Sequence, residues 1–481
     1  MNKLIKNYIY NVGYQIFLIV VPVITAPYLA RILGPTQLGI YSYVNSVTSI
    51  ITTVGLLGLQ SYAYREIAYV RDNNIMFTKT VSQIFLLRIF IFVIISIFYV
   101  PYCYISDYST YFFVQYLLVL SVFLDVSWIF IGMENLGIVA FRNFVAKLIT
   151  VIGIFIFIKS RNDLWIYFFL FSFVTFITTI SMFPIVKKYI KFSNISLKDI
   201  FNHIIPSIKL FIPQIATMLY LQFDKIMLQI LGSGSEQVAF YDQAEKFINI
   251  PLTVITALCT VMVPRIANLY ANKNFQSIEY YMNKTIKFSL FLSVPMMFGL
   301  ISISEELIPW YLGSSFQKVS LLVIFLSPLT IMNSISNVFG AQYLTATNKT
   351  QALTISYYSA AILNIFLNAY LIPTFDSIGT AVATIISILF SIIIQYVFVK
   401  RDLIFNFNLK NILNYFFASM LMGIIVKFIG ISLGSHLYTT FLQILIGASI
   451  YMMLMILFKD EICLLLLTRI KKLNRKRVKE D

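Results

Sequence analysis

The chain has 481 residues, of which 59% are hydrophobic and only 12% are charged. A soluble globular domain has about 45–50% apolar and about 25% charged residues, so this composition excludes a soluble globular protein and indicates an integral membrane protein. The formal net charge of +16 does not indicate nucleic-acid binding, because lysine and arginine collect in alternate loops between apolar segments. That distribution is typical of the cytoplasmic loops of membrane proteins.

Apolar segments of about 20 residues, each long enough to cross a hydrocarbon core of ~30 Å, recur along the whole chain. The first is expected to be an uncleaved span, because the apolar run to Leu33 is too long for a signal peptide and no small-x-small cleavage site ends it. We therefore predict an all-α polytopic membrane protein with about 14 transmembrane helices, at 9–33, 38–62, 80–101, 111–132, 139–159, 164–187, 206–231, 239–263, 283–304, 318–342, 351–372, 377–399, 411–433 and 438–458.

The charges of the loops predict the orientation. The cation-rich loops begin with Lys3 and Lys6 and end with the run "RIKKLNRKRVK" at 469–479, while the intervening loops carry few cations. Both termini are therefore expected to be cytoplasmic, which requires an even number of spans. The outer loops are short, so the sequence leaves no room for an external catalytic domain.

Two halves of the chain resemble each other. "ILG" at 32–34 matches "ILG" at 230–232, Tyr41 matches Tyr241, and Arg65 matches Arg265. Internal repeats of this kind mark many transporters whose two bundles rock about a central site. We predict two pseudo-repeated lobes with these boundaries: an N-terminal lobe at 1–190, an amphipathic cytoplasmic linker at 191–205, a C-terminal lobe at 206–400, two additional helices at 401–460 and a basic cytoplasmic tail at 461–481.

Ionisable residues inside the predicted spans are candidates for function, because one at mid-bilayer costs about 2.5–3.5 kcal/mol and therefore usually faces protein or water. Arg88 lies about two turns into its span, where it either lines a cavity, reaches the inner interface or pairs with Asp125. For Asp125, pairing with a cation is favoured over a proton relay. Glu245 begins a span and is expected to lie at the interface or in a charge pair, with ion coupling as the alternative.

Asp224 and Lys225 stand together about a turn and a half before Gly232. Adjacent residues point about 100° apart on a helix, so these two cannot simply neutralise each other, and one is expected to face the interior. Arg31, Arg65 and Arg265 lie at helix ends, where arginine ordinarily anchors a span. Arg31 is unusual because it lies on the cation-poor outer side, so it is a candidate for a central cavity.

No feature of the chain indicates an enzyme. The two histidines, His203 and His436, each stand alone, and there is neither a Walker-type phosphate loop nor a Cys/His metal cluster. We therefore expect no catalytic residues, no metal and no cofactor.

The residues also resemble a known family. The segments "PYLARILGPTQLGIYSYVNSV" at 27–47, "GLLGLQSYAYREIA" at 55–68 and "VMVPRIANLYANKN" at 261–274 are similar to the polysaccharide transporter branch of the multidrug/oligosaccharidyl-lipid/polysaccharide (MOP) exporter superfamily. The resemblance covers the whole length and implies a V-shaped central cavity between the two lobes. It implies a flippase that moves undecaprenyl-pyrophosphate-linked oligosaccharide repeat units across the bacterial plasma membrane, for capsule, O-antigen or exopolysaccharide. The implied partners are the lipid-linked oligosaccharide, the bilayer, and a polysaccharide polymerase with its chain-length regulator.

The resemblance also bears on single residues. In the related lipid II flippases, arginines at the ends of the first, second and eighth helices bind near the pyrophosphate, and Arg31, Arg65 and Arg265 occupy similar motif positions. That family has an acid near the start of its second helix, where this chain has Leu38-Gly39, so a shared scheme of ion coupling does not follow. The candidate substrate-binding residues are Arg31, Arg65, Arg88, Lys225 and Arg265, and the candidates for ion coupling or charge pairing are Asp125, Asp224 and Glu245.

Two alternatives remain open. An ion-coupled drug or metabolite antiporter of the same fold predicts a cavity dominated by acids, whereas these candidates include slightly more cations. A membrane polysaccharide polymerase or glycosyltransferase predicts a long outer loop with catalytic Arg, Asp or His, and the sequence shows none. The sequence does not decide which sugar is moved, or whether protons, sodium or the membrane potential drives the movement.

Overall fold

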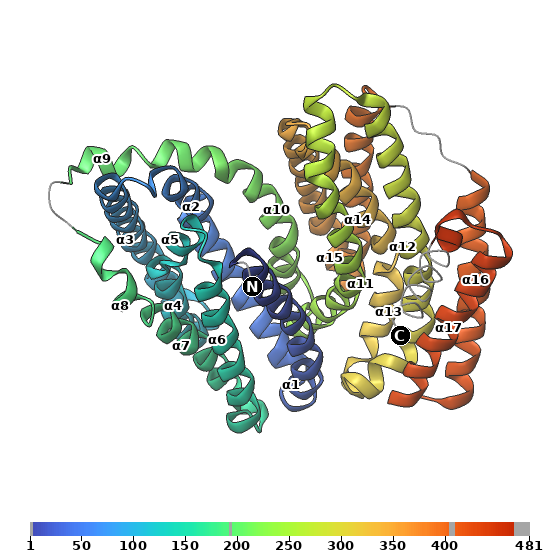
Figure 1. The fold of residues 1–481 in the computed structure, drawn as a ribbon. Helices are drawn as coiled ribbons and strands as arrows, with labels where there is room; N and C mark the ends of the chain where they lie inside the picture. The colour runs from blue at the N-terminus through green and yellow to red at the C-terminus, as the bar shows by residue number, and fades with distance from the viewer. Residues whose placement is uncertain (1–2, 192–194, 404–408, 466–481) are drawn as a thin grey trace, which may run out of the picture. The chain divides into compact units, whose positions relative to one another are not determined.

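The computed structural model describes residues 3–191, 195–403 and 409–465, without the side chains of 3–20, 213, 214, 216, 217 and 219–221. This part of the chain is built from helices (Figure 1). It divides into two compact units: unit 1 comprises residues 1–230 and 234–239, and unit 2 comprises 231–233 and 240–481. The predicted boundaries at 190, 205, 400 and 460 stay a prediction, and the basic tail from residue 466 on lies outside the described residues.

Unit 1 contains the helices that precede the turn at 232–234, together with the first residues of α11. Their bounds are α1 Lys3–Leu56, α2 Leu59–Val70, α3 Asn74–Ile105, α4 Ser109–Leu124, α5 Ser127–Gly132, α6 Leu136–Phe157, η1 Arg161–Asp163, α7 Leu164–Ile180, α8 Phe183–Val186, η2 Lys187–Tyr189, α9 Leu197–Phe201 and α10 Ile204–Leu231.

Unit 2 contains the remaining helices, which include one π-helical segment, η4. Their bounds are α11 Ser235–Ala271, α12 Phe275–Tyr311, η3 Ser314–Phe316, α13 Gln317–Leu326, α14 Leu329–Asn337, η4 Val338–Thr345, α15 Thr350–Lys400, α16 Leu409–Leu433 and α17 Leu437–Leu457. The last two, α16 and α17, pack against each other and along α12 (Figure 1).

Each of the fourteen predicted segments has a helical counterpart, and in two pairs the successive helices meet at a kink with no loop between them. Helix α1 runs through Gly34, whose φ of 75° and ψ of 176° leave the helical region, and α15 runs through Asp376 with φ 51° and ψ −131°. Within the described residues, nine helices are long and apolar enough to cross a membrane, or eleven if each of two bent pairs is taken as one span. The predicted multi-span helical fold is confirmed, and the gap between the predicted segments 9–33 and 38–62 coincides with the kink at Gly34.

The outer surfaces of both units are strongly apolar. Phe98 is 71% exposed on α3, and Phe428 is 72% exposed on α16. In a soluble protein such side chains would cost free energy, whereas lipid tails solvate them as well as a protein core does. The exposed apolar surface therefore agrees with the membrane location read from composition.

The amphipathic linker predicted at 191–205 stays a prediction, and residues 192–194 of it lie outside the described part. Helix α9 packs against α3 and buries Ile200, while Leu197 is 71% exposed. The oxygen of Tyr62 lies 2.7 Å from His203 Nδ1, and His203 Nε2 lies 3.2 Å from Gln83 Oε1. Because an amide oxygen only accepts, Nε2 carries the proton and Nδ1 accepts from the Tyr62 hydroxyl.

This arrangement predicts that acid loosens the linker. Burial lowers the pKa of His203 from its usual 6.5, and the nearby Asp199 opposes that shift while forming a 2.9 Å ion pair with Lys79. A lowered pKa in the docked state means that docking is fully stable above pH 6.5 and weakens as the pH falls towards the lowered pKa. We expect amide hydrogen exchange in α9 to speed up between pH 7 and pH 5 in the wild type.

The variant His203→Gln should remove this pH dependence. The chain has two histidines, so His436→Gln is the matched control and should keep the wild-type response. Equal acid sensitivity in the His203→Gln variant would contradict the assignment.

Candidate functional site

Arg31 lies in the last turn of the first half of α1, directly before the break at Gly34. Its side chain is exposed, and Pro22 and Pro27 lie upstream in the same helix. Arg161 of η1 approaches the same break, since its Nε would lie 3.7 Å from a Cβ atom at Gly34. Arg161 is therefore a second cation at this helix end, and no motif in the sequence pointed to it.

The second copy of the hairpin, at α10 and α11, differs from the first in its polar contacts. Gln229, the counterpart of Arg31, donates from Nε2 to the hydroxyl of Tyr108 at 3.0 Å. Tyr108 in turn lies 3.2 Å from the hydroxyl oxygen of Ser235. In this copy a neutral amide forms a hydrogen bond between the hairpin and the connection from α3 to α4. At the matching position the first copy has the guanidinium of Arg31.

Arg65 and Arg265, the two matched arginines, are both seated beside tyrosines. The Arg65 guanidinium lies 5.9 Å from the ring centre of Tyr62, and that of Arg265 lies 4.0 Å from the ring centre of Tyr281. Arg265 is exposed and Arg65 half-buried. A cation over an aromatic face is attracted by the ring while its N–H groups stay available at the edge, so both arginines are held without being buried.

Arg88 is completely buried in unit 1. Its Nε donates to the carbonyl of Phe123 at 3.0 Å, its Nη2 to the carbonyl of Val122 at 2.5 Å and its Nη1 to Gln60 Oε1 at 3.1 Å. These carbonyls belong to the last turn of α4, where no backbone N–H group of the helix is available to donate to them. The contacts favour a structural role for Arg88, as the side chain that caps the end of α4.

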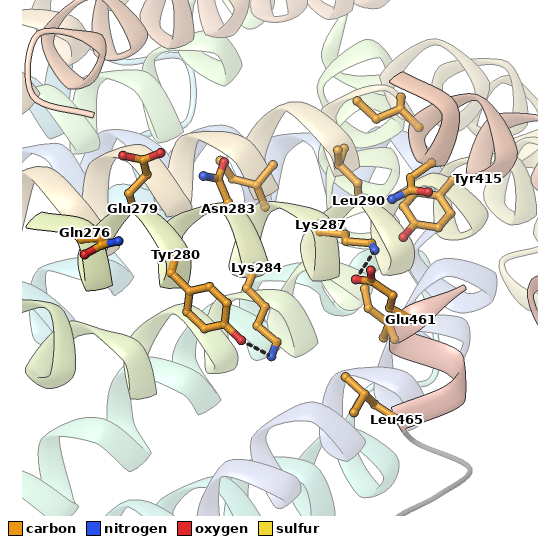
Figure 2. Close-up of a pocket in the computed structure, with 14 residues that line it drawn as sticks. Gln276, Glu279, Tyr280, Asn283, Lys284, Lys287, Leu290, Tyr415, Glu461 and Leu465 are labelled. Carbon is orange, nitrogen blue, oxygen red and sulfur yellow. Dashed lines mark hydrogen bonds and ion pairs between the residues drawn. The ribbon is translucent and has the colours of Figure 1, made fainter. Parts of the chain in front are cut away.

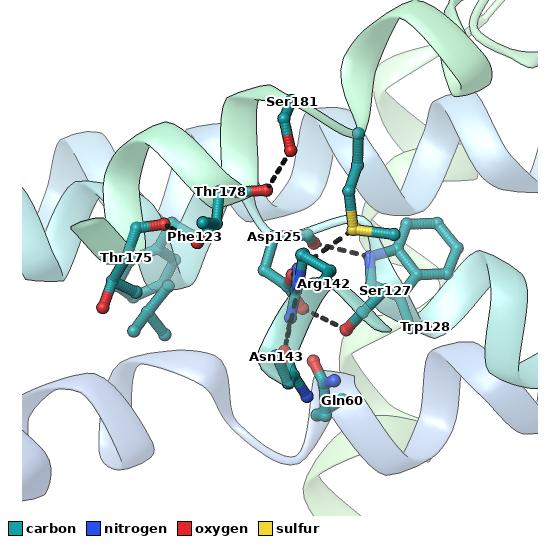
Figure 3. A network of polar contacts seen from close by, with 12 residues as sticks. Gln60, Phe123, Asp125, Ser127, Trp128, Arg142, Asn143, Thr175, Thr178 and Ser181 are labelled. Atoms are coloured by element: carbon teal, nitrogen blue, oxygen red, sulfur yellow. Dashed lines mark hydrogen bonds and ion pairs between the residues drawn. The ribbon is translucent and has the colours of Figure 1, made fainter. Parts of the chain in front are cut away.

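Asp125 occupies the break between α4 and α5, and its partner is Arg142 of α6 rather than Arg88. Figure 3 shows the two side chains meeting, with Arg142 Nη1 2.5 Å from Asp125 Oδ1. Arg142 also donates to Asn143 Oδ1 at 3.0 Å, and the hydroxyl of Ser127 donates to Asp125. The sequence suggested the right kind of contact for Asp125, a charge pair, but the alternative that named Arg88 as its partner is wrong.

Asp224 and Lys225 lie near the end of α10, and Glu245 lies in the third turn of α11. Asp224 is buried, with 2% of its surface exposed, while Lys225 and Glu245 are half-buried. The two neighbours on α10 thus differ in burial, as expected for adjacent residues of a helix. Close to Glu245, Lys246 forms a 2.7 Å ion pair with Asp242 one turn earlier.

The structure places Arg31, Arg65, Arg88, Asp125, Asp224 and Lys225 in unit 1, and Glu245 and Arg265 in unit 2. Within the described ranges, no three His, Cys, Asp or Glu side chains come close enough together to hold a metal ion. Unit 1 therefore offers the exposed Arg31, the half-buried Arg65 and Lys225, and one buried acid, Asp224.

Several curated proteins are similar in sequence. The chain is 22% identical over 385 residues to the "Putative O-antigen transporter" of Escherichia coli, covering 78% of this chain and 92% of that protein. The corresponding protein of Shigella dysenteriae is 25% identical, with 79% and 95% covered. The "Lipid II flippase MurJ" of Bacillus subtilis is 25% identical over 195 residues, and this match spans 40% of this chain and 36% of that flippase.

Two solved structures share the fold. "Lipid II flippase MurJ, inward closed conformation" superposes with a TM-score of 0.68 at 17% identity, covering 95% of this chain and all of that one. An inward-facing multidrug resistance MATE family transporter of the MOP superfamily gives a TM-score of 0.64 at 12% identity, covering 81% of this chain and 94% of that one. The fold is therefore the one shared by the MurJ and MATE transporters.

Two family models also match the chain. The model described as "MatE" matches residues 210–370. The model described as "Polysaccharide biosynthesis protein" matches residues 4–270, which is more than half of the sequence. The chain thus belongs to the polysaccharide biosynthesis protein family.

Proposed function

We propose that this protein is a flippase that moves undecaprenyl-pyrophosphate-linked oligosaccharide repeat units from the inner to the outer face of the bacterial plasma membrane. The observation that carries the proposal is the similarity to two O-antigen transporters over 92% and 95% of their lengths. The units serve capsule, O-antigen or exopolysaccharide synthesis, and movement occurs by alternating access. Both termini are cytoplasmic, and a polymerase and a chain-length regulator act on the exported units.

The candidate cations divide into two groups by exposure. Arg31 and Arg265 are exposed, Arg65 and Lys225 are half-buried, and Arg88 is fully buried with its donors engaged by carbonyl and amide oxygens. A guanidinium recognises phosphate oxygens through paired N–H donors. The proposal therefore assigns the pyrophosphate to Arg31, Arg65, Lys225 and Arg265, and assigns Arg88 to the scaffold.

Two sources of driving force are compatible with these residues. An inside-negative membrane potential favours outward movement of an anion by about 2.3 kcal/mol per charge per 100 mV. Asp224 and Glu245 are the candidates for ion coupling. Asp125 is a weaker candidate, because its carboxylate is already paired with Arg142.

The proposal predicts that Arg31→Gln and Lys225→Ala lower export without lowering the amount of protein in the membrane. Each variant removes a charge that contacts the pyrophosphate, and one charge-assisted hydrogen bond is worth about 1.5–3 kcal/mol, or roughly ten- to a hundred-fold in binding. The measurement uses a deletion strain complemented with each variant. Surface polysaccharide is quantified together with the lipid-linked repeat units left on the cytoplasmic face.

The matched control is Lys188→Gln, which removes an exposed cation of η2 that lies over the ring of Tyr189. It should export like the wild type. The flippase proposal fails if the deletion strain still delivers repeat units to the outer face at the normal rate. The assignment of residues fails, with the flippase proposal intact, if both site variants export as well as Lys188→Gln.

A second candidate, an ion-coupled drug or metabolite antiporter, is kept because the "MatE" model matches residues 210–370. It predicts that the deletion strain becomes sensitive to cationic drugs and still makes surface polysaccharide. The deletion strain described above separates the two candidate functions. The flippase proposal predicts that this strain stops making surface polysaccharide and does not become sensitive to cationic drugs.

A further inference from the structure

A lysine, Lys147, lies near the middle of α6, a helix long and apolar enough to cross a membrane. At 1.5 Å per residue, Lys147 is about 15 Å from either end of the helix. A lysine side chain is too short to bring its ammonium to an interface from that depth. An ionised group in mid-membrane costs free energy and therefore usually faces protein or water. The surroundings of Lys147 show which of these it faces.

The side chain of Lys147 projects from the protein-facing side of α6. Successive residues of a helix are 100° apart, so Ile154 and Thr150 lie about 20° and about 60° from Lys147 around the helix axis, and both are buried. Leu148 and Ile152 lie about 100° and about 140° away and are 40% and 49% exposed. Lys147 itself is half-buried. Its side chain is thus directed into unit 1 without being fully enclosed there.

No acid is placed to neutralise Lys147. Helix α6 packs mainly against α1, α7 and α5 (Figure 1), and none of these four helices contains an aspartate or a glutamate. Asp125, at the break before α5, is already paired with Arg142 of α6. Among the residues that the structure describes, none forms a hydrogen bond or an ion pair with Lys147. The ammonium is therefore uncompensated within unit 1.

Two lysines of α12 show how different this is from a lysine that is held by its neighbours. Lys287 Nζ lies 2.8 Å from Glu461 Oε2, and Lys284 Nζ donates to the hydroxyl of Tyr280 at 3.0 Å (Figure 2). The carboxylate of Glu461 interacts with both ammonium groups. Both of these lysines thus have partners supplied by the protein, whereas Lys147 has the free donors that an anionic ligand requires.

Two further cations lie along the boundary between α1 and α6. The hydroxyl of Tyr28 on α1 donates to the carbonyl of Ile158, directly after α6, at 2.7 Å. Arg31 follows Tyr28 by about one turn and is exposed, and Arg161 of η1 lies close to the helix break after Arg31. The boundary therefore has a cation at mid-depth, Lys147, and two more at the end that the loop charges predict to be the outer one.

We propose that Lys147 binds the pyrophosphate of the transported lipid at mid-membrane, on its way to Arg31 and Arg161. The inference rests on the proposed flippase function and adds a binding residue to it. An ammonium binds phosphate oxygens as a point charge, so it holds the group without fixing one orientation. Lys147 thereby offsets the charge of the pyrophosphate at the depth where the surrounding helices are otherwise apolar.

Export by two substitutions at this position tests the proposal. Lys147→Met removes the charge and keeps a side chain of similar length, while Lys147→Arg keeps a charge that cannot be lost by deprotonation. In the complemented deletion strain, we expect Lys147→Met to lower export at least several-fold and Lys147→Arg to retain most of it. Normal export by Lys147→Met contradicts the proposal. Loss of export in Lys147→Arg also contradicts it, and would indicate a lysine that must release a proton.

The matched control is Lys159→Met, the same substitution at the end of the same helix. Lys159 is exposed, and its ammonium donates to the carbonyl of Phe155. This variant should export like the wild type. An equal loss of export in Lys159→Met and Lys147→Met would contradict a specific role for the lysine at mid-depth.

Thermal unfolding of the full-length protein, purified in detergent, separates ligand binding from a role in the fold. Removing an uncompensated charge from a protein-facing position relieves a desolvation cost. Lys147→Met should therefore unfold at the same temperature as the wild type or at a higher one. A lower unfolding temperature would show that Lys147 supports the fold, and would overturn the proposal.

Native mass spectrometry of the same proteins measures binding directly, with undecaprenyl pyrophosphate and undecaprenol as probes. We expect the wild type to retain undecaprenyl pyrophosphate in preference, and we expect this preference to fall several-fold in Lys147→Met. If the wild type shows no preference, the proposed function itself is contradicted. If the wild type shows it and Lys147→Met shows it equally, only the assignment of Lys147 is contradicted.

Discussion

Replacing Gly39 with alanine is expected to prevent the protein from reaching a stable fold. A methyl group at this position would lie 1.7 Å from the carbonyl oxygen of Ser235, at the first turn of α11. Beside this contact, Thr36 donates to Glu236 Oε1 at 2.7 Å. The two copies of the repeated hairpin thus meet backbone to backbone within unit 1. Because the obstacle is a backbone atom and not the end of a flexible side chain, the cost should exceed the about 1–3 kcal/mol typical of an overpacked core.

The matched control is Gly299→Ala in α12, where no atom lies within 4 Å of the added methyl group. Alanine is favoured over glycine inside a helix by about 0.5–1 kcal/mol, so this variant should be as stable as the wild type or slightly more so. Size-exclusion profiles and thermal unfolding of the detergent-purified proteins provide the comparison. If Gly39→Ala unfolds at the same temperature as Gly299→Ala, the close approach of the two hairpins does not exist in the protein.

Replacing Arg88 with leucine is expected to produce the second large loss. The leucine fills part of the space but donates nothing to the carbonyls of Val122 and Phe123, which stay buried at the end of α4. Each unsatisfied buried carbonyl costs about 1–3 kcal/mol, so the free energy of unfolding should fall by roughly 2–6 kcal/mol. Arg88→Lys should recover only part of the loss, because an ammonium cannot reproduce the planar fork that reaches three acceptors.

Arg71→Leu is the control for this prediction. Arg71 also forms a charged contact, with Glu134 at 2.8 Å, but both side chains are exposed. Exposed ion pairs contribute about 0–1 kcal/mol, so this variant should unfold close to the wild type. A loss of stability in Arg88→Leu no larger than that in Arg71→Leu would show that Arg88 does not cap α4, and would return it to the candidates for the substrate cavity.

The two arginines show why a charge in an apolar segment is hard to interpret from sequence. Along the chain, Arg88 lies within a long apolar run and Arg31 lies at the end of one. In the structure Arg88 is enclosed by three acceptors, whereas Arg31 is exposed at a helix break. The neighbours of Arg88 come from α4 and α2, whereas Arg31 lies beside the break at Gly34. For Arg88 these neighbours are distant in sequence.

The positions of the helices, though not their exact ends, could be predicted from local patterns. Hydropathy is additive along a segment, so it located the fourteen helical segments. Glycine with proline located the break at Gly34, because only a residue without a Cβ adopts its φ of 75° at little cost. The repeat was also visible in sequence, through the paired positions Tyr41 and Tyr241.

Side-chain partners could not be predicted in the same way. The sequence favoured a cation as the partner of Asp125, but the choice of Arg142 over Arg88 depends on how α6 is rotated and how closely it approaches the break after α4. The role of Gly39 depends on the approach of a backbone nearly 200 residues later in the chain. Local composition fixes whether a segment is helical and apolar, because helix propensity and hydropathy are both sums over residues that are neighbours in the sequence. The partner of each charge and each glycine was decided only by the packing of helices that the sequence places far apart.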